Sequence, residues 1–367
     1  MTLKSLLQNL NEQITEEGVT MFNIYREGIF DCCLRALKRS SFSPFHKISV
    51  NFSDIEGTGE GAVDAGGPSR EMFRLVLNHI KESSMFCGSD KKYIRLDMRA
   101  MNERHYYAAG QMIALSLIHG GDGPHFFSQS FYSVLRQDIA EGFPTINDID
   151  DHHIRDELNK LSNATDASVI QDILDKNQFF TIAGYEVITD MKTKDQLLDD
   201  VTKFYAFHRI RPALGQFREG LNTGMIYELL KSHPNLFQNT MCQTEDITSN
   251  TLEKLFSIMY SEQGSSKRSI ENRIISFWRD FLLDCEDNVT EVTLKDVIIF
   301  ITAAETVPPL GFSIAPKITF LHDDATLYPK ANTCALEISL PTCHSSYDKF
   351  KQHMAFGIGN CKDFAFA

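Results

Sequence analysis

The chain has 367 residues, which is enough for two or three compact units with cores of their own. Hydrophobic residues make up 43% of it and charged residues 23%, a balance typical of globular proteins. The formal net charge is −13 and no Lys/Arg cluster stands out, so we expect no nucleic-acid partner. The N-terminus lacks the basic and apolar parts of a signal peptide, and the longest apolar run, Val297–Ala304, is too short to span a bilayer. We therefore expect no membrane partner.

Eight cysteines are scattered along the chain, and none forms a Cys-x-x-Cys pair. This spacing does not support a zinc ribbon or a thioredoxin-type site, and the sequence also lacks His-Glu-x-x-His. We expect no metal and no cofactor. Scattered cysteines in a chain without an export signal predict free thiols in a reducing compartment. This favours the cytoplasm and leaves the nucleus open.

The first elements in chain order are predicted from hydrophobic periodicity. Residues 1–40 are predicted to be helical, because their apolar residues recur at helical spacing. Residues 47–52 alternate like a strand, and a glycine-rich loop at 57–67 leads into a helix that starts near Pro68. A strand, a glycine-rich loop and a helix can form a phosphate-binding loop. The required lysine and third glycine are absent, so we expect no nucleotide site.

The middle of the chain combines a predicted core with a polar, acidic region. Residues 105–135 predict a buried helix followed by an aromatic cluster, which we interpret as core packing rather than a cofactor site. Residues 146–198 contain many aspartates, expected on solvated faces and at helix caps. Within them, the apolar run at 179–185 predicts a core strand.

The last third predicts a second structural unit. Residues 201–237 are helical, and Gly220 is predicted near a helix end. The small, polar segment 261–268 is the best linker candidate, and a helix at 269–283 follows it. Residues 289–304 are rich in β-branched side chains, which favour a strand by propensity alone.

Residues 328–341 place a cysteine directly before an alternating strand. Leu336, Ile338 and Leu340 are predicted to face the core, and Pro341 to end the strand. The thiol of Cys334 therefore lies at a loop-to-strand junction, which a large partner can reach more easily than a cysteine inside a helix. Most cysteines are inert buried hydrophobes, and the surrounding pattern is what separates Cys334 from the other seven.

The same stretch resembles the signature of HECT-type ubiquitin ligases, roughly Leu-Pro-x-Ala-x-Thr-Cys followed by a strand that ends in Leu-Pro. Further matches lie at 63–73, which is similar to Asp-x-Gly-Gly-x-x-Arg-Glu-x-Phe, and at the helix near Trp278, which is similar to Ile-x-x-Phe-Trp. Residues 307–312 resemble Val-Pro-x-x-Gly-Phe. The resemblance runs from about residue 20 to 367 and is weakest at 146–200.

The resemblance implies an α+β, bilobal fold. A larger, mostly helical N-terminal lobe would occupy residues 1–260, and a smaller α/β C-terminal lobe would occupy 269–367. A flexible hinge at 261–268 would join them. The resemblance also favours a helix over a strand at 289–304, with Thr293 as its cap.

By resemblance, the activity is that of a ubiquitin-protein transferase. A ubiquitin-conjugating enzyme would dock on the small subdomain at 146–200. By resemblance, the run at 179–185 would then be part of the docking surface, as an alternative to its interpretation as a core strand. Cys334 would accept ubiquitin as a thioester and pass it to a lysine of a protein substrate, the hinge carrying the motion. The candidate docking side chains are Phe179, Phe180, Ile182 and Tyr185.

Three further residues qualify this interpretation. Thr333 is expected either to steady the developing oxyanion and orient the thiol, or only to pack the loop. Phe364, fourth from the C-terminus, matches the position of a phenylalanine that acts in transfer to lysine in the family. Asn332 departs from the histidine common there, and an asparagine cannot act as a base near neutral pH.

Two other classes of protein stay open on sequence alone. One is a HECT-like interaction module that binds without transferring ubiquitin. The other is a papain-like cysteine hydrolase, which needs a histidine beside Cys334 and for which no Cys-Gly-Ser-Cys-Trp-type context exists. A thioester assay distinguishes all three.

Overall fold

The computed structural model describes residues 1–53, 64–136, 144–185, 194–243, 246–322 and 325–360. It divides into two compact units. Unit 1 comprises Met1–Asn78, Leu115–Gly123 and Thr244–Ala367, and unit 2 comprises His79–Ala114 and Pro124–Gln243. Within the described ranges, no helix is both long and apolar enough to cross a membrane. The mixture of helices and strands confirms the predicted α+β class.

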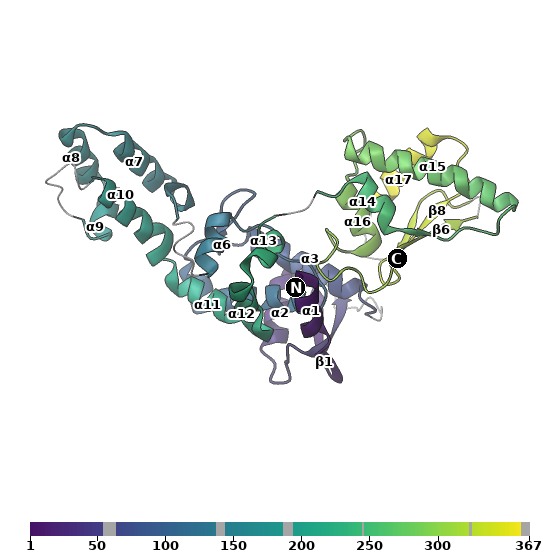
Figure 1. The fold of residues 1–367 in the computed structure, drawn as a ribbon, viewed down its shortest axis with the longest axis horizontal. Coiled ribbons are helices and arrows are strands. Elements are labelled where there is room, and N and C mark those ends of the chain that lie inside the picture. Colours follow the sequence, from purple (N-terminus) through teal and green to yellow (C-terminus); the bar gives the residue numbers. More distant parts are fainter. Residues whose placement is uncertain (54–63, 137–143, 186–193, 244–245, 323–324, 361–367) are drawn as a thin grey trace. The chain divides into compact units, whose positions relative to one another are not determined.

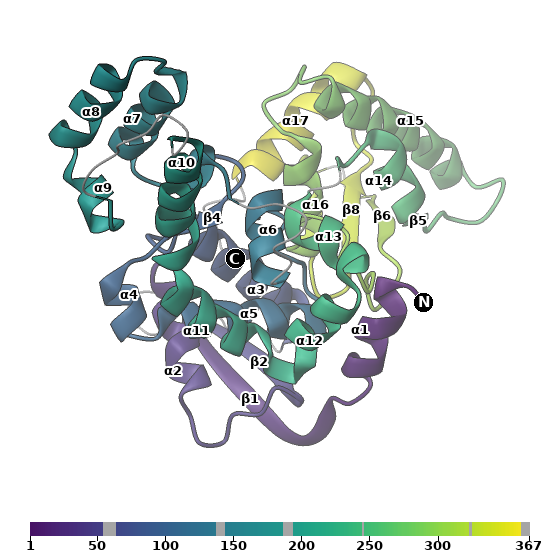
Figure 2. The same ribbon diagram turned by 60° about the vertical axis from the view of Figure 1, so that its left-hand side comes forward.

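The elements of unit 1 come from both ends of the chain (Figures 1 and 2). Its helices and strands are α1 (Leu3–Asn11), β1 (Thr15–Tyr25), η1 (Arg26–Gly28), α2 (Ile29–Leu37), β2 (His46–Ser53), most of α3 (Gly67–Glu82), α14 (Ser249–Leu255), β5 (Ser257–Ile258), α15 (Ser266–Glu286), α16 (Leu294–Thr302), β6 (Lys317–Leu321), β7 (Lys330–Asn332), β8 (Glu337–Pro341) and α17 (Tyr347–Asn360).

The elements of unit 2 are mainly helical, with one short hairpin. They are β3 (Phe86–Cys87), β4 (Tyr93–Ile94), α4 (Met98–Asn102), most of α5 (His105–Ile118), α6 (Gln129–Arg136), η2 (Ile146–Asp148), α7 (His152–Asn163), α8 (Ala167–Lys176), α9 (Gln178–Ile182), α10 (Lys194–Lys203), η4 (Phe204–His208), α11 (Arg211–Leu221), η5 (Thr223–Met225), α12 (Ile226–Ser232) and α13 (Pro234–Cys242).

The predicted helix over residues 1–40 is wrong in its middle, which forms strand β1. Along β1 the burial alternates, with Phe22 and Ile24 buried and Val19 and Met21 exposed. Strand β1 pairs in parallel with β2 along one edge, and α2 provides the crossover between the two strands. Periodicity misled the prediction because the apolar residues of β1 run directly into those of α2.

The first turn of α3 is tied to β2 through one carboxylate. Asp64 accepts hydrogen bonds from the backbone N–H groups of Val50 at 2.9 Å and Gly66 at 2.8 Å, and from the hydroxyl of Ser69. Acceptors at a helix start satisfy donors that the helix itself leaves unpaired. The predicted helix near Pro68 is confirmed. Most of the glycine-rich loop expected at 57–67 lies outside the described residues.

The aromatic cluster of unit 2 is core, as the sequence predicts. Phe127 has ring centroids of Phe86, Phe131 and Phe217 within 6.0 Å, and all four rings are buried. Gly220 lies in the last turn of α11, near the predicted helix end. The reason for glycine there is close packing, because a Cβ at this position would lie 1.8 Å from the Tyr107 carbonyl oxygen on α5.

The residues expected to form a small subdomain fold as a helical cluster, α7 to α10 (Figure 1). Asp151 and Asp166 cap α7 and α8 by accepting hydrogen bonds from backbone N–H groups, as predicted for this acidic region. The core strand predicted at 179–185 is wrong, because Gln178–Ile182 forms the short helix α9. The paired rings Phe179 and Phe180 fill the space between helices, which needs no strand partner.

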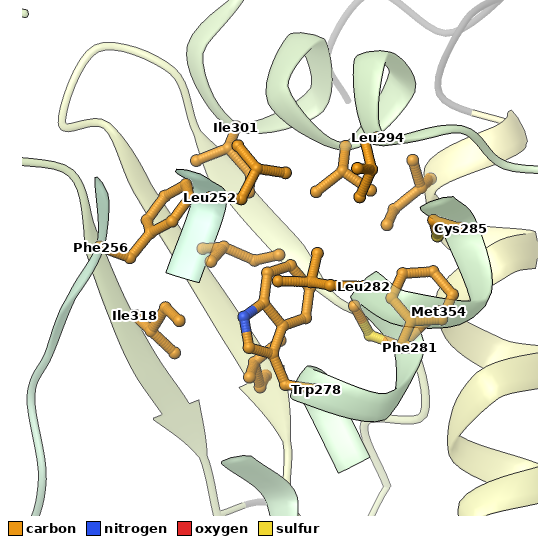
Figure 3. Packing of buried hydrophobic residues seen from close by; sticks show 14 of the residues in the cluster. Leu252, Phe256, Trp278, Phe281, Leu282, Cys285, Leu294, Ile301, Ile318 and Met354 are labelled. Atoms are coloured by element: carbon orange, nitrogen blue, oxygen red, sulfur yellow. The ribbon is translucent and has the colours of Figure 1, made fainter. Parts of the chain in front are cut away.

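The C-terminal part of unit 1 contains a four-stranded sheet in the order β5-β6-β8-β7. Strands β5, β6 and β8 are parallel, whereas β7 runs antiparallel to β8. Trp278 of α15 is 1% exposed, and side chains from α14, α15, α16, α17 and β6 surround it (Figure 3). Residues 294–302 form the helix α16 rather than a strand, and Thr293 caps it through a capping box.

The segment 261–268, predicted as a hinge, does not separate two cores. The elements α14 and β5 before it and α15 after it pack into the same hydrophobic core. Buried Glu271 accepts hydrogen bonds from the backbone N–H of Ser261 at 2.8 Å and from its hydroxyl. The predicted position of the hinge is therefore wrong, because composition alone cannot show which flanking residues share a core. The division into two mobile lobes stays a prediction.

Candidate active site

Cys334 lies in the four-residue turn, Thr333–Leu336, that joins β7 to β8. The Asn332 side-chain oxygen accepts a hydrogen bond from the Ala335 N–H at 3.0 Å, and the Thr333 carbonyl accepts one from the Leu336 N–H at 3.4 Å. An asparagine that bonds the backbone in this way is a common means of holding a turn. Asn332 thus acts on the shape of the loop, a role that needs no titratable group.

The turn is anchored by a residue in an unusual backbone conformation. Leu336 has φ of 50°, in the left-handed region that side chains other than glycine rarely adopt, and it is fully buried. Its carbonyl accepts a hydrogen bond from Lys317 of β6 at 2.9 Å. Burial of the leucine side chain holds the backbone in this conformation, so the turn after Cys334 has little freedom to rearrange.

The predicted strand after the cysteine is confirmed as β8, and the predicted burial alternates as expected. Leu336, Ile338 and Leu340 are fully buried, whereas Glu337 and Ser339 are half-buried, and Pro341 is the last residue of the strand. The short strand β7 before the turn was not expected. It results from antiparallel pairing with β8, which a loop-like sequence does not reveal.

The thiol of Cys334 packs against the first residue of α3. A Cβ at Gly67 would lie 2.5 Å from the Thr333 hydroxyl, 3.0 Å from the Cys334 sulfur and 3.1 Å from the Cys334 nitrogen. Only a residue without a side chain permits this approach. The cysteine is half-buried, with one side of its loop covered by α3.

Most of the other described thiols are in less reactive surroundings. Cys33 and Cys242 are buried, and burial raises the pKa of Cys33 and raises the pKa of Cys242 to about 12. Burial likewise raises the pKa of Cys87 and that of Cys285 to about 11. A thiol with a raised pKa forms little thiolate near neutral pH and is a poor nucleophile. Cys334 and Cys343 are both half-buried, so exposure alone does not choose between them.

Two histidines support the segment that leads to the cysteine loop. The His344 ring nitrogen contacts the Leu327 carbonyl at 2.9 Å, and its ring lies 4.9 Å from that of His353. Burial lowers the pKa of His353, and the neighbouring His344 lowers it further. Tyr328 covers His353, with ring centroids 5.4 Å apart. The sequence did not single out these residues, since they lie 10 and 19 positions beyond Cys334 on other elements.

The candidate docking residues meet at α9 but differ in exposure. Phe179 and Phe180 are buried, Ile182 is 66% exposed, and the Tyr185 hydroxyl donates a hydrogen bond to Asp200. Of these four, Ile182 therefore offers the largest free apolar surface. Phe364 lies outside the described residues. In the described part of the chain, no group of three or more His, Cys, Asp or Glu side chains is arranged to hold a metal ion.

Comparison with known proteins places the chain in a family. A family model, HECT-domain (ubiquitin-transferase), matches residues 68–367. The G2/M phase-specific E3 ubiquitin-protein ligase of Gallus gallus is 31% identical over 96% of this chain and 47% of its own length, and that of Homo sapiens is 28% identical over 98% and 49%. The E3 ubiquitin-protein ligase NEDD4 of Mus musculus is 23% identical over 84% of this chain and 36% of its own.

The match identifies a ubiquitin-transferase type of domain. The chain belongs to the HECT-domain (ubiquitin-transferase) family. It spans about half the length of the G2/M phase-specific ligases that it matches.

Proposed function

We propose that this protein is a ubiquitin-protein ligase that takes ubiquitin from a conjugating enzyme as a thioester on Cys334 and transfers it to a lysine of a protein substrate. The observation that carries the proposal is the position of Cys334. Its thiol lies in a turn between two strands, held by the Asn332 side chain and by buried Leu336, in a chain of the HECT-domain family.

The proposed reaction has two acyl transfers. In the first, the thiolate form of Cys334 attacks the thioester carbonyl carbon of the charged conjugating enzyme, and the carbon–sulfur bond to that enzyme's cysteine breaks as its thiolate leaves. In the second, a neutral lysine amine attacks the new thioester. The bond to Cys334 breaks, the cysteine leaves as thiolate and the lysine nitrogen gives up a proton. Each step needs a fixed position of the sulfur more than it needs a new chemical group.

Two other residues have proposed roles in these steps. Thr333 has its hydroxyl at the contact with Gly67, where it either orients the thiol or only packs the loop. Phe364 is proposed to act in transfer to lysine. The expected result for Phe364→Ala is a protein that still loads ubiquitin and fails to discharge it. A variant that unfolds early and cannot load would instead assign Phe364 to core packing.

The partners follow from the same proposal. They are a ubiquitin-conjugating enzyme, ubiquitin and a protein substrate, with α9 and Ile182 as the proposed docking surface for the enzyme. A cytoplasmic location is proposed from the free thiols, since none of the seven described cysteines forms a disulfide.

The test is a thioester assay with a panel of charged conjugating enzymes. The expected product is an adduct of the chain and ubiquitin that a reducing agent removes. Cys334→Ala should abolish the adduct. Cys343→Ala is the matched control, because Cys343 is also half-buried and lies nine residues away, with its thiol hydrogen-bonded to the Thr326 carbonyl at 3.3 Å.

The outcomes separate the three classes of protein. An adduct that persists in Cys334→Ala contradicts the assignment of the nucleophile. Binding of the conjugating enzyme without any adduct, across the whole panel, identifies an interaction module instead. Hydrolysis of a ubiquitin thioester or peptide, without transfer to an amine, would identify a hydrolase.

A further inference from the structure

One face of α3 donates hydrogen bonds to the C-terminal elements of unit 1. Arg70, Arg74 and Asn78 are spaced four residues apart, so they lie on one side of the helix. Arg74 donates from Nε to the Ala303 carbonyl at 3.2 Å, and Asn78 donates to the Glu305 carboxylate at 2.6 Å. This face therefore meets the end of α16.

The end of α16 is an electrostatically suitable acceptor. Ala303, its C-cap, has φ of 63°, a left-handed conformation that stops the helix. Carbonyl groups in the last turn of a helix have no partner within the helix and carry the negative end of its dipole. Cationic donors on α3 fit this site.

Arg70 differs from its neighbours because it reaches the cysteine loop as well. Its Nε donates to the Thr302 carbonyl at 2.8 Å, and its Nη2 donates to the carbonyl of Thr333, the residue directly before Cys334. One rigid guanidinium thus joins the end of α16 to the turn that carries the thiol. Burial lowers the pKa of Arg70, while the nearby Cys334 and Asp64 act in the opposite direction. An arginine stays charged under such conditions.

The Arg70 hydrogen bonds and the Gly67 contact act on the same turn, and both involve Thr333. Gly67 lies at the start of α3 and meets Thr333 and the Cys334 sulfur, and Arg70 lies one turn later and holds the Thr333 carbonyl. The glycine permits the close approach and the arginine fixes it. The sulfur then has one defined position relative to α3.

We propose that Arg70 is a positioning residue for the transfer reaction, which holds the Thr333–Cys334 turn against the first turn of α3 by bridging two backbone carbonyls. The role in transfer rests on the proposed function. Loading also depends on how a large partner presents its thioester. Attack by lysine on the loaded thioester depends directly on where the loop holds it, so the larger effect belongs to discharge.

The first test needs no ubiquitin. The full-length protein is treated with iodoacetamide, and alkylation of Cys334 is followed by peptide mass spectrometry on the alkaline plateau of the rate. Arg70→Ala should speed alkylation of Cys334 by about threefold or more, because a released loop opens more often. Alkylation of Cys343 serves as the internal reference and should not change. An unchanged rate at Cys334 would overturn the positioning role.

The second test separates the two transfer steps. A pulse of charged conjugating enzyme loads the protein, and a chase with a lysine substrate measures discharge. Arg70→Ala should load ubiquitin at a rate within about twofold of the unmodified chain. Its discharge should be slower by about tenfold or more, an effect of the size expected when a reacting atom is misplaced by roughly an ångström. Arg70→Lys keeps the charge but not the planar fork, and should not restore discharge.

Arg74→Ala is the matched control, because it removes the same charge from the same helix face and loses a contact only with α16. In Arg74→Ala the rates of Cys334 alkylation and of ubiquitin discharge should stay within about twofold of those of the unmodified chain. Equal losses in Arg70→Ala and Arg74→Ala, or full discharge by Arg70→Lys, would overturn the proposal. If the unmodified chain forms no thioester, the proposed function fails, and the alkylation experiment still decides whether Arg70 positions the loop.

Discussion

Substitution of Gly220 by alanine should destabilise unit 2, because α5 and α11 touch through their backbones at this point. The new Cβ would lie 1.8 Å from the Tyr107 carbonyl oxygen and 2.7 Å from its carbon. An ordinary contact begins at 3.4 Å, so the two helices must separate locally by 3.4 − 1.8 = 1.6 Å. No side-chain rotation relieves a clash between a Cβ and a backbone. Gly110 on α5 makes the reciprocal contact, since its Cβ would lie 2.3 Å from the Phe217 carbonyl oxygen.

The expected cost is at the upper end of overpacking, about 3 kcal/mol or more. For a unit of this size, each kcal/mol lowers the melting temperature by about 2–4 °C, so a fall of roughly 6–12 °C is expected in thermal unfolding followed by circular dichroism. Gly215→Ala is the matched control on the same helix. No atom lies within 4 Å of its Cβ position, and alanine there should stabilise by up to about 1 kcal/mol. An unchanged melting temperature in Gly220→Ala would refute the close-packing explanation.

Three further predictions concern the Cys334 turn, the buried Glu271 and the proposed docking surface on α9. Gly67→Ala, whose Cβ would lie 2.5 Å from the Thr333 hydroxyl, should slow ubiquitin discharge about tenfold with little change in melting temperature, and unchanged kinetics would contradict it. The pKa of Glu271 lies below its ordinary value of 4.5, because the hydrogen bonds that its carboxylate accepts outweigh the raising effect of burial. The ionised carboxylate therefore stabilises the fold above pH 4.5, and this stabilisation is lost as the pH falls. The free energy of unfolding of Glu271→Gln should consequently fall less steeply at acid pH than that of the unmodified chain. An equally steep acid limb in this variant would count against the carboxylate. Ile182→Arg should weaken binding of the conjugating enzyme about tenfold or more, by a binding titration, without changing stability. Retained binding by Ile182→Arg would exclude α9 from the docking surface. Phe180→Ala should instead lower the free energy of unfolding by about 3–5 kcal/mol, because its ring is buried.

The sequence by itself determined the features that depend on neighbouring residues. The turn before β8, the alternating burial of β8, Pro341 at its end and the helix near Pro68 follow from local pattern. The helix capped by Thr293 followed from the family resemblance, because local propensity alone favoured a strand there. The motif around Cys334 also indicated the family, because signature residues are read in chain order. Local rules failed at β1 and α9, where the side chains fit two periodicities and only the partner elements select one.

The tertiary structure decided what depends on residues far apart in the chain. No local pattern shows that Arg70 donates a hydrogen bond to the carbonyl of Thr333, 263 residues later. Nor does it show that a distant part of the chain approaches Gly67 and Gly220 too closely for a side chain. The segment 261–268 has the composition of a hinge and the position of a loop within one core, since α14 and β5 pack with α15. Burial against a particular partner is a property of the folded chain, and composition describes only the chain before it folds.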